Sequence, residues 1–428
     1  MRRSTLTGTA LAALAALFAT SWMGTAGADK KGGYVETDLV TNKAPLTDKN
    51  GIVHPVNNPK AIVDGKLQNP WGLTESATSP FWVSDNAIGF ETLYNVPGTT
   101  PLVASKNPLE VSVPLPGSLG GGAPTGNVFN TTVNLPMSQQ EFMISGFSQT
   151  TGCKTNTTKA TARFLFATED GTIVGWAPTL YPTQDLCTAG GTSTNGIIAV
   201  DNSARGQGGG QGVGTGKGKG NGLSAVYKGL AIATDATGTF LYVTNFRAGR
   251  VEKYDGTFAL VDTFTDKKVP PRYAPFNISL INGKLFVTFA VQNAERHDDV
   301  AGAGNGIVDT FDLSGNMLQR FAEHGALNSP WGLTITPALF GDLGGGKLWI
   351  GNFGNGQINA FDAATGAFAG TVNKPCVAAC TAQPILIDGL WSIRFGNDGP
   401  GGSSNTLYFT AGPNGETDGV FGALSPHP

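Results

Sequence analysis

Oxygen-bearing side chains stand at recurring places in this chain, where short apolar runs begin or end. Amide and carboxylate oxygens are the ligands that Ca²⁺ prefers, six to eight at a time. If the fold brings these side chains to one place, we expect one Ca²⁺ ion there. The candidate ligands are Asn69, Asn86, Asn245, Asn352, Asp388 and Glu416.

The same residue types also have a purely structural role. Asn and Asp end strands because their side chains bond the local backbone and tolerate left-handed turns. We expect this structural role for most of the six, and for Glu169 and Asn328 at similar positions.

Three tryptophans, Trp71, Trp331 and Trp391, occupy one place in related segments. An indole can stack on a sugar or another planar ligand, or it can fill space between neighbouring units of a fold. Both roles remain open, and packing is the one that we favour.

Histidines are sparse, and one lies in an acidic segment. His297 stands in AERHDDV beside Asp298 and Asp299. Such a loop can bind metal, although a solvated turn is the commoner outcome. No GxSxG motif or other local catalytic signature occurs in the chain.

A repeat indicates how these residues are positioned. LQNPWGL at 67–73 returns as LNSPWGL at 327–333. Around it, a pair of apolar runs joined by a Gly-containing turn recurs six times, which is typical of β-hairpins. The six copies lie at 81–95, 164–177, 241–255, 285–312, 348–362 and 407–424.

A third element precedes each hairpin, with an unclear copy near 125–146, and a fourth follows several of them. The fourth elements include TPLVA at 100–104, FALVDTF, NMLQRFA and AFAGTVN. Six units of four strands predict an all-β fold, a six-bladed β-propeller of four-stranded antiparallel blades. The last unit lacks its fourth strand, so we expect the lone strand at 34–42 to close the last blade.

The propeller geometry predicts where the candidate residues lie in space. The first strand of each blade lines the central channel, and the second returns to the face where the first began. The candidate ligands therefore belong near one channel mouth. In the repeat, we expect Pro to set the strand start, Trp to pack against a neighbouring blade and Gly to allow close approach near the axis.

The segment 204–222 is rich in glycine and contains two lysines. No register gives GxxxxGK followed by Ser or Thr, and none gives GxGxxG, so a phosphate-binding loop is excluded. We interpret it as a flexible insertion between blades.

The first 28 residues have the layout of a secretory signal peptide: a basic start, an apolar run and small residues at a cleavage site. The remainder, 29–428, is predicted to be a single propeller domain without a transmembrane segment. Removal of the leader takes two positive charges, which shifts the formal charge from −3 to −5. We therefore expect no nucleic-acid partner, an exported monomer and a periplasmic or extracellular location.

Four cysteines in an exported chain predict two disulfides. Local pairing, Cys153–Cys187 and Cys376–Cys380, is the simplest of the three connectivities. A metal site is the alternative, but no histidine lies near either pair.

The motifs also carry a family resemblance. PWGL followed by WVSDN or WIGNF, and then NGQINAFD, resembles NHL-type repeats. Together with VYKGLAI and DGLWSIRFGN, the order is similar to a family of uncharacterised exported bacterial propellers, some of which carry a Pro-Glu-Pro sorting signal. This chain ends in GALSPHP and lacks that signal.

A more distant similarity, to gluconolactonase-type propellers, implies a divalent ion that polarises a substrate carbonyl. The first blade of those enzymes begins with a Glu-Gly-Pro signature that supplies a metal ligand, where this chain has Asn69-Pro70-Trp71-Gly72. We therefore expect a binding or interaction module whose channel-mouth face takes a protein, a glycan or a small molecule. A Ca²⁺-dependent lactonase or esterase is the alternative.

Overall fold

The computed structural model describes residues 32–47, 53–54, 56–98, 101–153, 158–187, 191–203, 224–376 and 381–427. The predicted signal peptide and the Gly-rich insertion lie outside the described residues. The regular secondary structure of the described chain is almost entirely antiparallel β-sheet, and each large sheet is named here by its first strand.

Three large sheets come from the first two thirds of the chain. The β5 sheet contains β5 (Pro70–Thr74), β6 (Phe81–Asp85), β7 (Phe90–Asn95) and β8 (Ser105–Ser112). The β9 sheet contains β9 (Pro124–Phe129), β12 (Phe164–Thr168), β13 (Thr172–Trp176) and β15 (Ile197–Asp201). The β16 sheet contains β16 (Tyr227–Asp235), β17 (Gly238–Asn245), β18 (Arg250–Tyr254) and β19 (Leu260–Phe264).

Three more follow. The β20 sheet contains β20 (Tyr273–Ile281), β21 (Lys284–Val291), β22 (Ile307–Phe311) and β23 (Met317–Glu323). The β24 sheet contains β24 (Pro330–Ile335), β25 (Leu348–Asn352), β26 (Ile358–Phe361) and β27 (Phe368–Thr371). The β28 sheet contains β28 (Leu390–Phe395), β29 (Leu407–Ala411), β30 (Val420–Pro426), β1 (Tyr34–Thr41) and β4 (Ile62–Val63).

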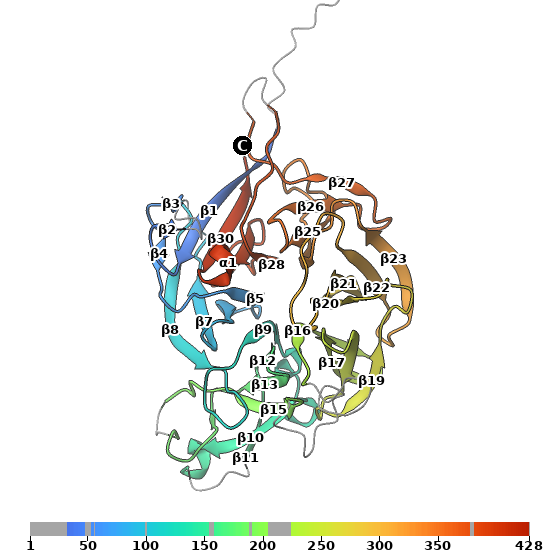
Figure 1. The fold of residues 1–428 in the computed structure, drawn as a ribbon. Coiled ribbons are helices and arrows are strands. Elements are labelled where there is room, and N and C mark those ends of the chain that lie inside the picture. Colours follow the sequence, from blue (N-terminus) through green and yellow to red (C-terminus); the bar gives the residue numbers. More distant parts are fainter. Residues whose placement is uncertain are drawn as a thin grey trace, which may run out of the picture.

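The sheets stand in a ring around a central axis, with their first strands innermost (Figure 1). This arrangement is a β-propeller, as the sequence predicts. The N-terminal strand β1 pairs antiparallel with β30, so that Tyr34 lies opposite Pro426 and the two ends of the chain share one sheet. Buried Tyr34 also donates a hydrogen bond to the carbonyl of Phe340, which ties this strand to the neighbouring β24 sheet.

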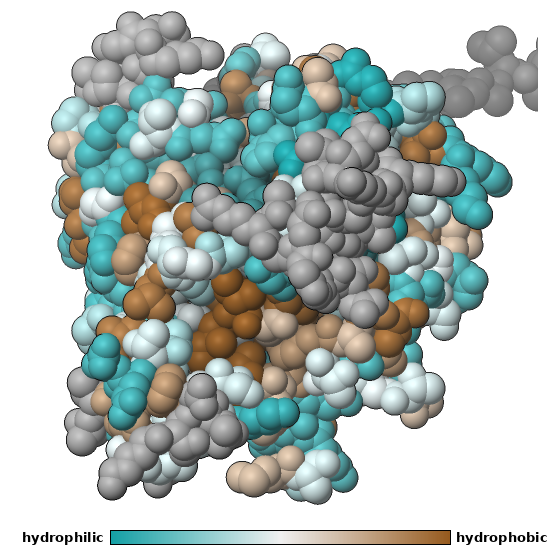
Figure 2. All heavy atoms as spheres, turned by 60° about the horizontal axis from the view of Figure 1, so that its bottom comes forward, coloured by the Kyte–Doolittle hydropathy of each residue, from teal (hydrophilic) through white to brown (hydrophobic). Residues whose placement is uncertain are grey.

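Smaller elements do not belong to the six large sheets. They are β2 (Leu46–Thr47), β3 (Val53–His54), β10 (Met143–Ser148), β11 (Thr158–Thr161), β14 (Leu180–Tyr181), the 3₁₀ turns at Thr131–Asn134, Met137–Gln139 and Gln149–Thr151, and α1 (Pro413–Glu416). Within the described part of the chain, no helix has the length and apolar character of a membrane span. Figure 2 shows a patch of hydrophobic residues on the side that carries the lower sheets of Figure 1.

Two sequence expectations need correction. The fourth strand of the β5 sheet is Ser105–Ser112, not 100–104, because the run KNPLEVSV pairs with β7. The unclear first strand near 125–146 is the short β9, which ends at Phe129. The chain from there to β12 contains β10 and β11, which form a small side sheet with β14 from beyond β13, and this insertion hid the repeat.

The predicted disulfide Cys153–Cys187 is present. The other predicted bridge includes Cys380, which lies outside the described residues.

Each first strand breaks register once where it pairs with the second strand of its sheet. Gly72 and Gly332 of the repeat lie at two of these irregularities. A Cβ at Gly72 would stand 2.4 Å from the carbonyl oxygen of Thr125, and one at Gly332 would stand 2.7 Å from that of Trp391. Both carbonyls belong to the next sheet, so these glycines let adjacent first strands touch.

Candidate functional site at the channel mouth

First strands begin, and second strands end, at the same mouth of the channel. Asn69 directly precedes β5 and Asn86 directly follows β6, and the backbone amide of Asn86 donates to the carbonyl of Asn69. The mouth therefore receives polar side chains from several sheets. The antiparallel hairpins alone dictate this placement.

A connected network crosses this mouth. The Nδ2 of Asn69 donates to Oε2 of Glu416 over 2.7 Å and lies 3.3 Å from Oδ1 of Asn86. Asn86 in turn donates to Oε2 of Glu169 over 3.0 Å. These side chains belong to α1 and to the starts and ends of strands in the β5 and β9 sheets.

Lys228, in β16, lies at the bottom of the network. Its side chain is 1% exposed, and Nζ forms an ion pair with Glu169 and lies 3.5 Å from Oδ1 of Asp298. The ammonium also lies 4.7 Å from the ring centroid of Trp71, within the range of a cation–π contact. A buried lysine needs such partners because an unpaired charge away from water is costly.

The loop between β21 and β22 supplies an imidazole and a carboxylate. Nδ1 of His297 lies 2.7 Å from Oδ1 of Asp298 and 3.9 Å from Oε1 of Glu169. We call Glu169, Lys228, His297 and Asp298 the mouth cluster. Glu169 and Lys228 are largely buried, whereas His297 and Asp298 remain accessible.

Charges at the mouth shift the carboxyl pKa values in opposite directions. The hydrogen bond from His297, together with Lys228, lowers the pKa of Asp298 to about 2 although partial burial opposes this. Burial, with repulsion from Glu169, raises the pKa of Glu416. Burial likewise raises the pKa of Asp299. Four carboxyl groups, those of Glu169, Asp298, Asp299 and Glu416, thus share this mouth with two cations, Lys228 and Arg247.

The donor atoms of Glu169, His297 and Asp298 all lie within 4.8 Å of one another. One imidazole nitrogen with two carboxylates is a ligand set for transition metals, whereas Ca²⁺ takes six to eight oxygens. The ammonium of Lys228 already neutralises Glu169. The trio of Glu169, His297 and Asp298 contains none of the six predicted Ca²⁺ ligands and by itself supplies fewer oxygens than a Ca²⁺ ion takes.

The structure brings together three of the six candidate ligands, Asn69, Asn86 and Glu416. It places the other three in local contacts. Asn245 is fully buried and donates to Glu252, and Asn352 donates to the carbonyl of Ala326. The carboxylate of Asp388 accepts a hydrogen bond from the backbone amide of Asn414.

The three tryptophans lie together below the mouth, at most 3% exposed. The rings of Trp71 and Trp391 stack at a centroid distance of 3.5 Å, and Trp331 meets both edge-on. With Phe246 and Phe276 they form an apolar cluster that we call the aromatic layer. In this structure no tryptophan of the layer presents a face to a ligand at the mouth.

Sequence reasoning missed Lys228, although a signal was present. VYKGLAI places a lone lysine in an otherwise apolar first strand, directly before a glycine. Such a lysine must find a charged partner near the axis. The proximity of Glu169 and His297 could not be predicted, because His297 lies in a loop 128 residues after Glu169 in the chain.

No family model matches the chain. Uncharacterized protein R648 of Acanthamoeba polyphaga mimivirus is 26% identical over 385 residues, which cover 88% of this chain and 79% of that protein. Uncharacterized protein L690 of the same virus is 31% identical over 208 residues, 47% of this chain and 51% of that protein. These relatives give no support to the bacterial and exported part of the predicted resemblance.

Solved structures with a similar course of the chain include two enzymes. A streptogramin B lyase matches with a TM-score of 0.43 and 10% identity, over 94% of this chain and 99% of that chain. The PQQ-bound aldose sugar dehydrogenase from Streptomyces coelicolor matches with a TM-score of 0.41 and 14% identity, over 93% and 99% of the two chains. At this level of similarity, neither transfers a substrate, a cofactor or an activity to this chain.

Proposed function

We propose that this chain is an exported six-bladed β-propeller that binds a small cationic ligand at its charged mouth. The six large sheets, each counted as one blade, the leader-like N-terminus and the disulfide support this description. The observation that carries the ligand class is the convergence of Glu169, Asp298 and Glu416 on one mouth.

The electrostatics favour a cation. Lys228 neutralises Glu169 from below but is itself nearly inaccessible, so that it cannot pair with a ligand from solvent. Within the mouth cluster, the groups that face solvent are the carboxylate of Asp298 and the imidazole of His297, while the half-buried guanidinium of Arg247 donates to Ser224. A positively charged group that approaches the mouth meets carboxylates and amide oxygens, which are good partners for an ammonium.

Hydrolysis of a lactone or an ester is the second candidate. The close contact of His297 with Asp298 orients the imidazole as a general base would require. The transition-metal ligand set of Glu169, His297 and Asp298 also favours it. Displacement of Lys228 from Glu169 would have to accompany metal binding, which makes this the weaker candidate.

Calorimetric titration of the purified chain distinguishes the two. Cadaverine, Ca²⁺ and Mn²⁺ serve as probes, and Glu169→Gln is compared with Glu323→Gln on the outermost strand β23. We expect cadaverine to bind, and its affinity to fall about tenfold in Glu169→Gln because a charge-assisted contact is lost. Glu323→Gln should bind like the wild type.

Two results would count against cationic-ligand binding. Tight binding of Mn²⁺ with no binding of cadaverine would favour the hydrolase. Equal loss of affinity in both variants would show that the effect is one of overall charge and not of the mouth.

A further inference from the structure

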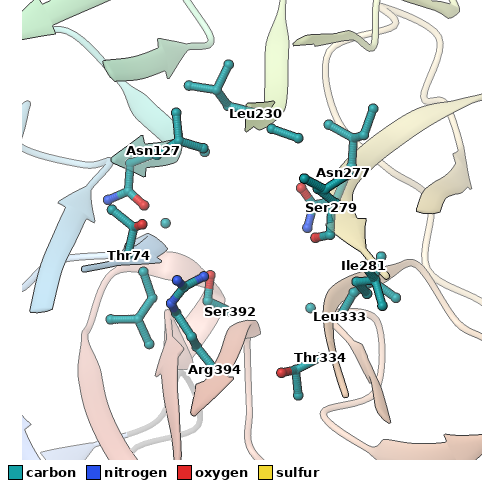
Figure 3. Close-up of a pocket in the computed structure, with 18 of the residues that line it drawn as sticks. Thr74, Asn127, Leu230, Asn277, Ser279, Ile281, Leu333, Thr334, Ser392 and Arg394 are labelled. Atoms are coloured by element: carbon teal, nitrogen blue, oxygen red, sulfur yellow. The ribbon is translucent and has the colours of Figure 1, made fainter. Parts of the chain in front are cut away.

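A cavity of about 580 Å³ opens at the end of the channel opposite the charged mouth. It lies where the first strands end, and all six contribute to its wall (Figure 3). Its volume lies within the range of about 300–1,000 Å³ that is typical of small-molecule sites. Neither the proposed ligand of the mouth nor the mouth cluster uses this space.

The wall is polar but carries no net charge. Of the lining residues that the structure describes, only Glu75 and Arg394 are charged, and they pair with each other over 2.6 Å. The remaining polar lining is neutral and stands between aliphatic side chains. The neutral polar side chains include Thr74, Asn127, Asn277, Ser279, Thr334 and Ser392, and the aliphatic ones include Leu230, Ile281 and Leu333.

Hydrogen-bonding groups in the cavity have spare capacity. The guanidinium of Arg394 donates through Nε to Glu75, and its two terminal nitrogens have no partner among the described residues. Its side chain is 43% exposed and points into the opening (Figure 3). Asn127 is fixed in the wall by hydrogen bonds from Nδ2 to Trp82 and Glu91; its Oδ1 is buried and has no hydrogen-bond partner in the described part of the chain.

The first strands add backbone N–H and C=O groups to the hydrogen-bonding groups of the cavity. Each of them is the terminal strand of its sheet and pairs only on its outer side. Some carbonyls of the other edge accept side-chain hydrogen bonds from a neighbouring sheet, as that of Trp331 does from Asn277. The other N–H and C=O groups of this edge have no strand partner and add donors and acceptors to the wall.

The aromatic layer separates the cavity from the charged mouth. Along β5, Asn69 at the mouth is followed by Trp71 of the layer and then by Thr74 of the cavity. Trp331 belongs both to the layer and to the cavity wall. The cavity is therefore a second compartment with an apolar end and polar walls.

We propose that this cavity binds a neutral carbohydrate, one or two sugar units in size. Sugar hydroxyls both donate and accept, so they match a wall that contains backbone groups, amides and hydroxyls. The Arg394–Glu75 pair adds a strong donor beside a strong acceptor without favouring a net charge. Aliphatic and aromatic wall residues meet the C–H faces of a sugar ring.

Saturation-transfer NMR and calorimetry with cellobiose, maltose and chitobiose test the proposal on the full chain. We expect at least one of the three to bind. Arg394→Gln should weaken it about tenfold through loss of the guanidinium donors, and Thr334→Phe, which fills the cavity, should abolish the signal. Lys267→Met is the matched control and should bind like the wild type, because this exposed lysine makes no hydrogen bond or ion pair with the described residues.

Thr334→Phe retains the Arg394–Glu75 pair, so it tests the site even if Arg394→Gln does not fold. No transfer to any of the three sugars would overturn the proposal. So would binding that Thr334→Phe leaves intact, or binding that Glu169→Gln abolishes, because the sugar would then occupy another surface or the charged mouth. Failure of the mouth to bind cadaverine leaves this test unaffected.

Discussion

Asn69 and Ser329 are the residues in which the two copies of the repeat differ directly before the proline. Both have left-handed backbone angles, with φ of 48° and 45°. Asn69 uses this conformation to reach three partners: it donates to Glu416 and Asn86 and accepts from Nε1 of buried Trp391 over 3.0 Å. The Oγ of Ser329 is buried near the carboxylate of Asp299, but the two groups do not meet hydrogen-bond geometry.

Replacement of these two residues by alanine should therefore have unequal effects. Asn69→Ala loses its hydrogen bonds, leaves the Trp391 N–H unpaired and puts alanine in a left-handed conformation, at a cost of about 2–4 kcal/mol. Ser329→Ala, the matched control, should change the free energy of unfolding by less than about 1 kcal/mol. Urea unfolding measures both, and equal losses would contradict the role assigned to Asn69.

For single residues, the sequence predicted the location of a side chain better than its interactions. Asn69, Asn86 and Glu416 could be assigned to one mouth because hairpin geometry fixes where strands start and end. Their hydrogen bonds to each other, rather than to an ion, depend on side-chain distances that no local pattern contains. Lys228 and the loop of His297 complete the site from distant parts of the chain.

Among the elements, the first strands decide how the sheets meet. Gly72 stands against the backbone of β9, and Thr410 of the β28 sheet donates to the carbonyl of Trp71 over 2.7 Å. Contacts of this kind join one first strand to the next around the axis. The role predicted for the glycine of the repeat, close approach near the axis, agrees with this geometry.

Gly72→Ala should be strongly destabilising, because its Cβ would meet the Thr125 carbonyl oxygen at 2.4 Å. We expect a loss of about 3 kcal/mol or more, with β5 and β9 forced apart. Gly65→Ala is the control, since a Cβ there meets nothing within 4 Å, and its effect should stay within about 1 kcal/mol. A small effect of Gly72→Ala in urea unfolding would refute the close-contact account.

Glu91 of β7 links two sheets from a fully buried position. Its carboxylate accepts hydrogen bonds from Ser84 and from Asn127 of β9, yet burial dominates and raises its pKa from 4.5 to about 8. The folded protein therefore holds this proton more tightly than the unfolded chain does. The resulting stabilisation is complete below 4.5 and is lost as the pH rises toward about 8.

Glu91→Gln should remove this contribution. The wild type should lose up to about 1.4 kcal/mol per pH unit from this group over that interval. The difference between the wild-type and Glu91→Gln unfolding curves, measured across the interval, isolates the effect from other carboxyls such as Glu36. A difference that does not change with pH would mean that Glu91 is ionised in the folded protein.

Strands were the most predictable elements, because alternating apolar residues and Gly-containing turns recur in each unit. The failures have physical reasons. The fourth strand of the β5 sheet contains Pro108, whose type is depleted in strands but tolerated on the sheet edge that β8 occupies. The first strand β9 lacks the PWGL motif, and a long insertion follows it.

At the scale of the whole molecule, the channel has two ends of different chemistry. One end holds the mouth cluster, with its surplus of carboxylates, and the other holds a neutral polar cavity. The aromatic layer between them contains Trp71, Trp331 and Trp391. The tryptophans of the repeat motif thus help to divide the channel, and its glycines allow contacts between sheets.

The ring arrangement and its closure by the N-terminal strand could be predicted from the repeat, because an incomplete last unit leaves an edge that another strand must cover. The division of the channel into a charged mouth and a neutral polar cavity could not be predicted. It depends on three tryptophans of the neighbouring β24, β28 and β5 sheets that meet near the axis, and the sequence shows only that they share one place in their repeats.

The most direct test of a ligand site at the charged mouth is the NMR spectrum of the histidine rings during titration with cadaverine. The chain contains four histidines, so isotope-labelled histidine gives few signals. The signal that disappears in His297→Gln is assigned to His297. We predict that cadaverine shifts the His297 signal in a saturable manner and leaves those of His324 and His427 unchanged. A His297 signal that does not move, or one that moves together with the other two, would contradict the account.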